Sequence, residues 1–303
     1  MSHLEEIRQQ FKKLDTLDSV KDFLDLRAAR HNNYFHYTSV TALRAMLQSK
    51  KLHLSLGKTM NDLFEIQKID PEKWERLYVA SFSFTSNESV ALWHIYGNPF
   101  NQAIRIQFSR TAVLKMLEKL KNCLKCKDVS LNERYYDIRK AGLVDIAYVQ
   151  NDQKSLRWNK ALLSDITCPQ ISRIHEEKLA GYIKNVAWEY EMETRLLVEL
   201  GSNDKFTKFP DKIQIDAEEL WIGAKILCGP CLSAEKFKNT MEEFFARNPS
   251  AIKLNLEYGK NLDNSILLNR VYFKSKCEKC DTRRQCGLLK QIENNHVCAQ
   301  DIR

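Results

Sequence analysis

The 303-residue chain carries a formal charge of +8 at pH 7, and its 44% hydrophobic and 28% charged residues are typical of an ordinary soluble globular protein. Its 9 glycines and 6 prolines exclude a largely disordered chain. No apolar run reaches the roughly eighteen residues that cross a membrane, and the polar amino terminus lacks the apolar stretch of a secretory signal, so we expect a cytoplasmic protein that contacts no membrane.

The first third of the chain predicts alternating helices and strands. Residues 3–30 place apolar side chains at helical spacing among many charges, which predicts one or two amphipathic helices in an amino-terminal prefix, residues 1–30. The aromatic run at 34–39 predicts a strand, followed by a helix that Thr38 or Ser39 would cap. A buried strand is expected at 77–84, with a helix over 88–97 after it.

The remaining sequence completes one mixed domain. Residues 111–140 are highly charged with one apolar face, which predicts helix. Four later runs rich in β-branched and apolar residues predict strands, at 144–150, 194–200, 212–216 and 219–228. The strands at 194–200 and 212–216 are expected to pair as a hairpin. A helix over 232–248 closes the main body. Because the order is mixed and shows no repeat, we predict an α+β domain over 31–260 and a separate tail over 270–303.

Four stretches of this domain carry a family resemblance: FHYTS, SFSF with LWHIYG, WEYEMETRL, and WIGAKILCGP, at 35–39, 81–97, 188–196 and 221–230. In this order they resemble the bacterial domain of unknown function 2971 family over roughly residues 34–240, although Thr194 stands where that family usually has a tryptophan. The ordered histidine, aromatic residue and glutamate are similar to those of ADP-ribosyltransferase-like folds, which split NAD between nicotinamide and ribose. The resemblance therefore implies a split mixed or antiparallel sheet core with peripheral helices.

Glu191 and Glu193 are the predicted catalytic pair. Cleavage of a glycosidic bond passes through an oxocarbenium-like state that a nearby carboxylate stabilises, and we assign that role to Glu193. Residues two apart in a strand share a face, so Glu191 is expected to project into the same cleft and orient the acceptor, as the resemblance to Glu-x-Glu transferases implies. Their repulsion should raise the pKa of one carboxyl. The alternative is a solvated strand face, or salt bridges with Arg195 and neighbouring lysines.

His36 leads the set of residues that the resemblance implies for NAD binding. Its imidazole would donate a hydrogen bond to a ribose hydroxyl and to the nicotinamide amide, and Tyr37 and Thr38 would assist at phosphate or amide groups. Taken alone, a histidine at this position is more simply a partly buried structural residue.

Tyr96 is the candidate for stacking on the nicotinamide ring, because a cationic heterocycle gains from an aromatic face. Trp93 lies on the same side of that helix, so one of the two aromatic residues is expected in the core. Ser83 is a second candidate for cofactor binding. Asn61, in an Asn-Asp-x-x-Glu stretch, would brace the pocket loop, and a plain turn explains the same letters.

The carboxy-terminal tail carries four cysteines at close spacing: Cys277, Cys280, Cys286 and Cys298. Thiolates so placed can hold tetrahedral zinc, with His296 as an alternative fourth ligand, while an iron–sulfur cluster would use the same residues. Four unliganded thiols are the remaining alternative. The pairs at 123 and 126 and at 228 and 231 have no sequence-local mate and are predicted to be packing thiols.

Together these features predict an intracellular ADP-ribosyltransferase that moves ADP-ribose from NAD to a macromolecule, with RNA or DNA favoured over protein because of the charge and the basic tail. A toxin or phage-defence effector fits such an enzyme, with an antitoxin as protein partner, and water as acceptor would make it an NAD hydrolase. Two alternatives are a nucleic-acid-binding module that binds no NAD, and a partner-binding component of a multi-protein defence system that docks through residues 3–30.

Overall fold

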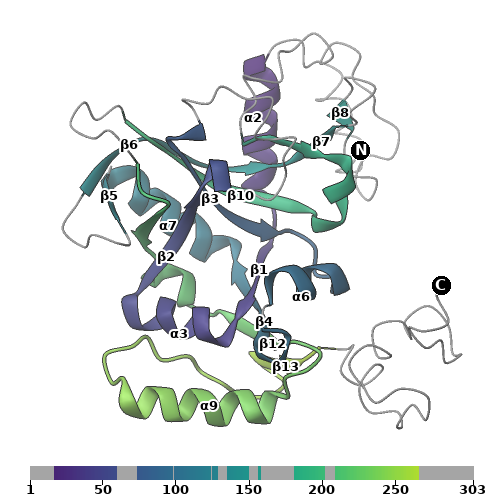
Figure 1. Cartoon of the computed structure of the whole chain (residues 1–303), viewed down its shortest axis with the longest axis vertical. Coiled ribbons are helices and arrows are strands. Elements are labelled where there is room, and N and C mark those ends of the chain that lie inside the picture. Colours follow the sequence, from purple (N-terminus) through teal and green to yellow (C-terminus); the bar gives the residue numbers. More distant parts are fainter. Residues whose placement is uncertain are drawn as a thin grey trace, which may run out of the picture. The chain divides into compact units, whose positions relative to one another are not determined.

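The structure of the protein is a computed structural model that describes residues 17–59, 74–97, 99–123, 125–128, 135–149, 156–157, 181–201 and 209–265 (Figure 1). These residues fold as mixed α+β with a mostly antiparallel sheet, which confirms the predicted fold class at that level. Two compact units make up the chain, and each combines segments that are distant in sequence. The first comprises Met1–Tyr34, Lys51–Thr85 and Ser109–Ile222, and the second comprises Phe35–Lys50, Ser86–Phe108 and Gly223–Arg303.

Six strands of the first unit pair in a closed ring. In ring order they are β10 (Glu193–Leu200), β6 (Tyr135–Asp145), β5 (Lys125–Asp128), β11 (Lys212–Asp216), β2 (Lys51–Leu56) and β3 (Leu77–Ser83). Every pair is antiparallel, and the ring closes because β10 pairs with β6 on one side and with β3 on the other. Strand β10 is buried along nearly all of its length, as expected for a strand covered on both faces.

Two helices and a small sheet complete the first unit. Helix α2 (Leu17–Ala28) packs against β6 and buries Val20 and Leu24, so part of the predicted amphipathic prefix forms a helix of this core. Helix α7 (Arg110–Cys123) packs against β6 and the 3-10 turn η6 (Glu218–Trp221). The small sheet joins β7 (Ala147–Val149) in antiparallel fashion to β8 (Leu156–Arg157) and in parallel to β9 (Ile183–Asn185).

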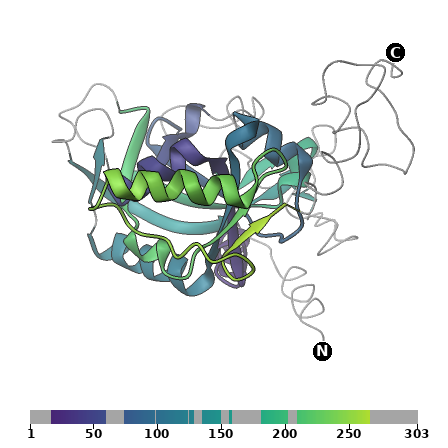
Figure 2. The ribbon, with the colours of Figure 1, turned by 90° about the horizontal axis from the view of Figure 1, so that it is seen from below.

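The second unit contains most of β1 (Asn33–Ser39) and β4 (Ala103–Ser109) and all of β12 (Lys225–Cys228) and β13 (Leu262–Asn264), which are neighbours in that order. Helix α3 (Val40–Ser49) begins at Ser39, whose hydroxyl accepts the backbone N–H of Ala42, so the cap is Ser39 rather than Thr38. Helix α6 (Val90–Tyr96) confirms the helix predicted after β3. Helix α9 (Ala234–Arg247) packs against β12 and β13 and is seen lengthwise in Figure 2.

Two sequence predictions about the first unit were wrong. The helix expected over 111–140 ends at Cys123, and residues 135–140 belong to β6, where buried and exposed side chains alternate with the period of a strand. The expected hairpin between 194–200 and 212–216 does not form, because β11 pairs with β2 and β5 instead of β10. In both places the local pattern identified apolar positions but not the partner strand.

Candidate functional site

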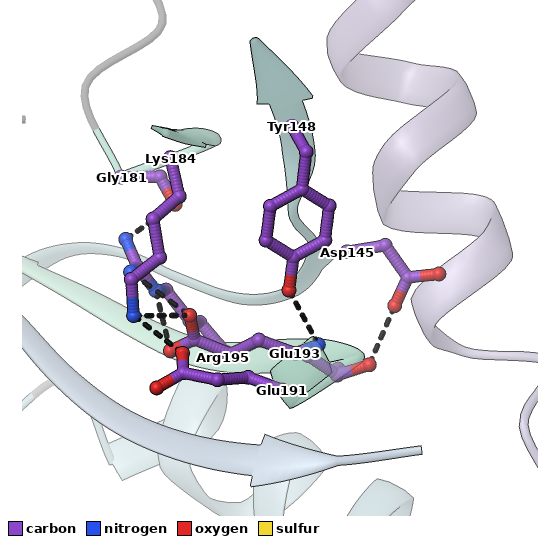
Figure 3. A network of polar contacts seen from close by, with 8 residues as sticks. Asp145, Tyr148, Gly181, Lys184, Glu191, Glu193 and Arg195 are labelled. Carbon is purple, nitrogen blue, oxygen red and sulfur yellow. Dashed lines mark hydrogen bonds and ion pairs between the residues drawn. The ribbon is translucent and has the colours of Figure 1, made fainter. Parts of the chain in front are cut away.

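Four charged side chains form a buried cluster at the start of β10 (Figure 3). The Arg195 guanidinium donates from Nε to Glu193 Oε1 at 2.8 Å and from Nη2 to Glu193 Oε2 at 3.0 Å, which is a two-point contact. The Lys184 ammonium lies 2.5 Å from Glu191 Oε2 and 3.3 Å from Glu193 Oε2. All four residues are at most 3% exposed, so water screens their charges little. The two positive and two negative charges balance one another.

The backbone before β10 explains how Glu191 and Glu193 meet. Glu191 ends the 3-10 helix η5 (Val186–Glu191), which Asn185 caps by accepting the backbone N–H of Ala187. Met192 then adopts the left-handed conformation at φ 49°, and Glu193 is the first residue of β10. The prediction that strand alternation brings the two carboxylates together was therefore wrong. They converge on Lys184 because the chain turns sharply at Met192.

Tyr148, on β7, supports the same turn. Its hydroxyl accepts the backbone N–H of Glu193 at 3.0 Å, which satisfies a donor at the buried start of β10. Burial raises the pKa of the Tyr148 phenol well above its ordinary value, and the negative charge of Glu193 raises it further. The phenol therefore stays neutral and keeps a hydroxyl that can donate one hydrogen bond while it accepts another.

The charges around Glu193 lower the pKa of its carboxyl. Burial alone would raise the pKa of the Glu193 carboxyl, but the charges of Arg195 and Lys184 and hydrogen bonds from Arg195 and Ser81 lower it to about 2. Glu193 is consequently ionised throughout the physiological range. The alternative interpretation of the two glutamates was salt bridges with Arg195 and neighbouring lysines. The structure contains such pairs, between Glu193 and both Arg195 and Lys184, and between Glu191 and Lys184.

This low pKa predicts a loss of stability in acid. A carboxyl whose pKa falls from 4.5 to about 2 on folding stabilises the native state fully above pH 4.5, and that contribution disappears as the pH falls toward 2. We expect Glu193 to account for roughly 3 kcal/mol of this loss. Urea unfolding between pH 7 and pH 2.5 measures it: the curves of the wild type and Glu193→Gln should converge in acid. Parallel curves would contradict the assignment.

A second buried cluster surrounds Asp145, the last residue of β6. Its carboxylate accepts from Arg27 Nε at 2.8 Å, from the Thr194 hydroxyl at 2.5 Å, and lies 2.8 and 2.9 Å from His31 Nε2. His31 also stacks on Phe84, with ring centroids 4.4 Å apart and planes 5° from parallel. Thr194 is thus fixed by a hydrogen bond from its hydroxyl to the carboxylate of Asp145.

Ser83 is brought next to the glutamate pair within the first unit. In the antiparallel pairing of β3 with β10, Ser83 lies directly opposite Glu193, and Ser81 lies opposite Arg195. Residues two apart on a strand share a face, so these four side chains occupy one polar face at the ends of two strands. Ser83 is buried, and its hydroxyl accepts the backbone N–H of Thr85 at 3.4 Å.

Four other predicted NAD contacts, His36, Tyr37, Thr38 and Tyr96, belong to the second unit. On β1, His36 is half-buried, while Tyr37 and Thr38 are buried. The Tyr37 hydroxyl accepts from the Ser89 backbone N–H at 3.3 Å and from Arg105 Nη1 at 3.4 Å. Tyr37 is therefore already engaged in holding the turn before α6.

Of the two aromatic residues of α6, Trp93 is the core residue. It is fully buried, packs edge-on against Tyr37 and donates from Nε1 to Glu88 Oε2 at 3.1 Å. Tyr96 is half-buried at the margin of the same cluster. Within the second unit, Tyr96 is thus the aromatic residue of α6 with more exposed ring surface, and it stays the candidate for stacking.

Several predicted site residues lie outside the described residues, namely Asn61, Cys277, Cys280, Cys286 and Cys298. Among the residues that the structure does describe, no cluster of three or more His, Cys, Asp or Glu side chains is arranged to hold a metal ion. Nor does any described helix have the length and apolar character needed to cross a bilayer. Cys228, one of the predicted packing thiols, is buried and free, and burial raises the pKa of its thiol to about 12.

Sequence reasoning did not identify Lys184, Asp145 or Tyr148. A signal was present, because Lys184 and Asp145 are single charges inside otherwise apolar runs, GYIKNVA and GLVDIAY. An isolated charge in a buried strand needs a partner, since burial of an unpaired charge is costly. That reasoning predicts a partner for each of these residues but does not identify it.

Comparisons with known proteins add little to this geometry. No family model matches the chain, and no curated protein matches it, so the family resemblance stays a prediction from four short stretches. Among solved structures, Thermus sp. 2.9 DarT in complex with carba-NAD+ is similar at 13% identity and a TM-score of 0.31, over 74% of this chain and 94% of that chain. The same protein in complex with NAD+ is similar at 14% identity and a TM-score of 0.30, over 75% of this chain and 94% of that chain. A likeness at this level establishes neither the fold nor the activity of the present chain.

Proposed function

We propose that the protein is an ADP-ribosyltransferase, which cleaves NAD and transfers ADP-ribose to a macromolecule, with nucleic acid favoured over protein as acceptor. The observation that carries the proposal is the state of Glu193. Its carboxylate is ionised and held by two hydrogen bonds from Arg195 at the start of β10, within the stretch that resembles the Glu-x-Glu signature. A fixed negative charge of this kind is what a developing oxocarbenium ion requires.

In the proposed reaction the bond between the nicotinamide nitrogen and the ribose carbon breaks, and nicotinamide leaves with the electron pair. The positive charge left on the ribose is stabilised by the Glu193 carboxylate, which needs no reorganisation because Arg195 already fixes it. The acceptor then bonds to the ribose carbon and loses a proton. Glu191 is proposed to orient that acceptor, and His36 and Tyr96 to contact the nicotinamide half of NAD.

Nucleic acid is preferred as acceptor because the chain carries a net charge of +8. A role as a toxin or defence effector, with a protein partner that restrains it, is part of the proposal. The cysteine tail is proposed to bind structural zinc, with an iron–sulfur cluster as the alternative.

Incubation of the full chain with NAD and cell lysate tests the proposal, with nicotinamide release as the readout. We expect Glu193→Gln to lower release by at least about a hundredfold. When NAD is labelled on its adenosine side, the label should appear on a macromolecule. Release of that label by nuclease is the expected result, and release by protease would instead identify a protein acceptor. Wild-type release no higher than that of Glu193→Gln would refute the activity.

The contacts of Glu193 would also stabilise a protein of any activity, so catalysis has to be separated from folding. Glu199→Gln is the matched control, because Glu199 lies on the same strand and its ion pair among the described residues is with the exposed Arg139, at 3.0 Å. It should retain full activity. His36→Ala offers an independent arm, since His36 is half-buried in the second unit and His53, half-buried on β2, provides its control. His36→Ala should raise KM for NAD about tenfold at an unchanged melting temperature, whereas His53→Ala should not.

A further inference from the structure

A cavity of about 180 Å³ lies within the second unit, between the first turns of α3 and α9 and the short 3-10 turn η2 (Phe100–Gln102). Its volume is several times the roughly 30 Å³ that one water occupies in the liquid. The lining combines three buried apolar side chains, Val40, Leu232 and Phe237, with polar groups, among them Asn101, Gln102 and Thr240.

The charges around this cavity have one sign. Arg44 and Lys236 both line it, and no aspartate or glutamate is among the lining residues. Lys236 is exposed and makes no ion pair with any residue that the structure describes. The amino ends of α3 and α9 add partial positive charge, which favours an anion at the same place.

The guanidinium of Arg44 is fixed in position, and one of its buried hydrogen-bond donors lacks an acceptor among the described residues. Its Nη2 donates to the backbone carbonyl of Thr240 at 2.8 Å, and its plane lies over the ring of Phe244, 5.6 Å from the centroid. A further donor, Nε, is buried and has no hydrogen-bond partner among the described residues. A buried donor without a partner is costly, so an acceptor supplied by a ligand would stabilise this arrangement.

We propose that this cavity binds a phosphate group, which we name the α3–α9 phosphate site. A tetrahedral dianion or phosphodiester would accept from Arg44, pair with Lys236 and accept further hydrogen bonds from the side-chain amides of Asn101 and Gln102, while the Thr41 hydroxyl donates to Gln102 Oε1 at 2.9 Å. The phosphate is either free or part of a nucleic-acid backbone, and both sources present the same oxygens. Phosphate binding here does not require that the chain cleave NAD.

Calorimetric titration of the full chain with inorganic phosphate, without NAD and at constant ionic strength, tests the site. We expect Lys236→Gln to weaken binding at least about tenfold, because it removes a charge-assisted contact. Lys238→Gln is the matched control, since it removes the same charge from the same helix but from an exposed pair with Glu242 at 3.9 Å. That control should stay within about twofold of wild type.

A labelled single-stranded DNA oligonucleotide identifies the source of the phosphate. If inorganic phosphate displaces the oligonucleotide, and Lys236→Gln weakens both, the site contacts the nucleic-acid backbone. If only phosphate binding weakens, the ligand is free phosphate. The proposal fails if wild type binds no phosphate, or if Lys236→Gln and Arg44→Gln weaken binding no more than Lys238→Gln does.

Discussion

Glu193→Gln is expected to lower the free energy of unfolding by about 3–5 kcal/mol at pH 7, because it removes one partner of a buried ion-pair cluster. The amide can accept one hydrogen bond from Arg195 but carries no charge. Lys184 and Arg195, both fully buried, would then share the single carboxylate of Glu191. Urea unfolding followed by circular dichroism measures the change.

The strand itself provides the control for this prediction. Glu199→Gln removes the same charge from β10 where the partner, Arg139, has a side chain that is 68% exposed, and it should cost no more than about 1 kcal/mol. A sharper version adds Lys184→Met to Glu193→Gln, which restores the balance of one cation and one carboxylate. The double variant should lose less stability than the sum of the single losses, by about 0.5–3 kcal/mol. Strict additivity would show that charge imbalance is not the cause.

The elements of the fold were predictable wherever a local pattern determined them. The strand at 34–39 followed by a helix, and the helix after β3, appear in the structure as β1, α3 and α6. Residues 135–140 end a charged segment whose overall pattern predicts helix, although Tyr136 and Ile138 are buried at strand spacing.

The two glutamates of the site were predictable, but their geometry and their buried partners were not. Glu191 and Glu193 do meet, yet through the left-handed turn at Met192, a conformation that a methionine adopts rarely and that no local pattern indicates. Their partner Lys184 comes from β9, and Asp145 connects β6 to α2 through Arg27. Such contacts depend on which segments the fold brings together, and a single sequence carries no information on that pairing.

The strongest test of the second cluster is Asp145→Asn, for which we expect a loss of about 3–5 kcal/mol in the free energy of unfolding. The substitution keeps the shape of the side chain and an oxygen that can accept from Thr194. It removes the negative charge opposite Arg27, a residue that is 7% exposed. Burial already lowers the pKa of the Arg27 guanidinium, and without Asp145 this buried cation loses its partner, which is costly. Thermal and urea unfolding measure the loss.

The matched control is Asp216→Asn, because Asp216 pairs with Lys51 at a site where its own side chain is 48% exposed. Solvent screens that pair, so the cost should stay below about 1 kcal/mol. Adding Arg27→Met to Asp145→Asn removes the unpaired guanidinium and should restore part of the stability. If Asp145→Asn behaved like Asp216→Asn, the contacts of Asp145 with Arg27 and His31 would contribute no more than a surface pair. The end of β6 would then depend on apolar packing alone.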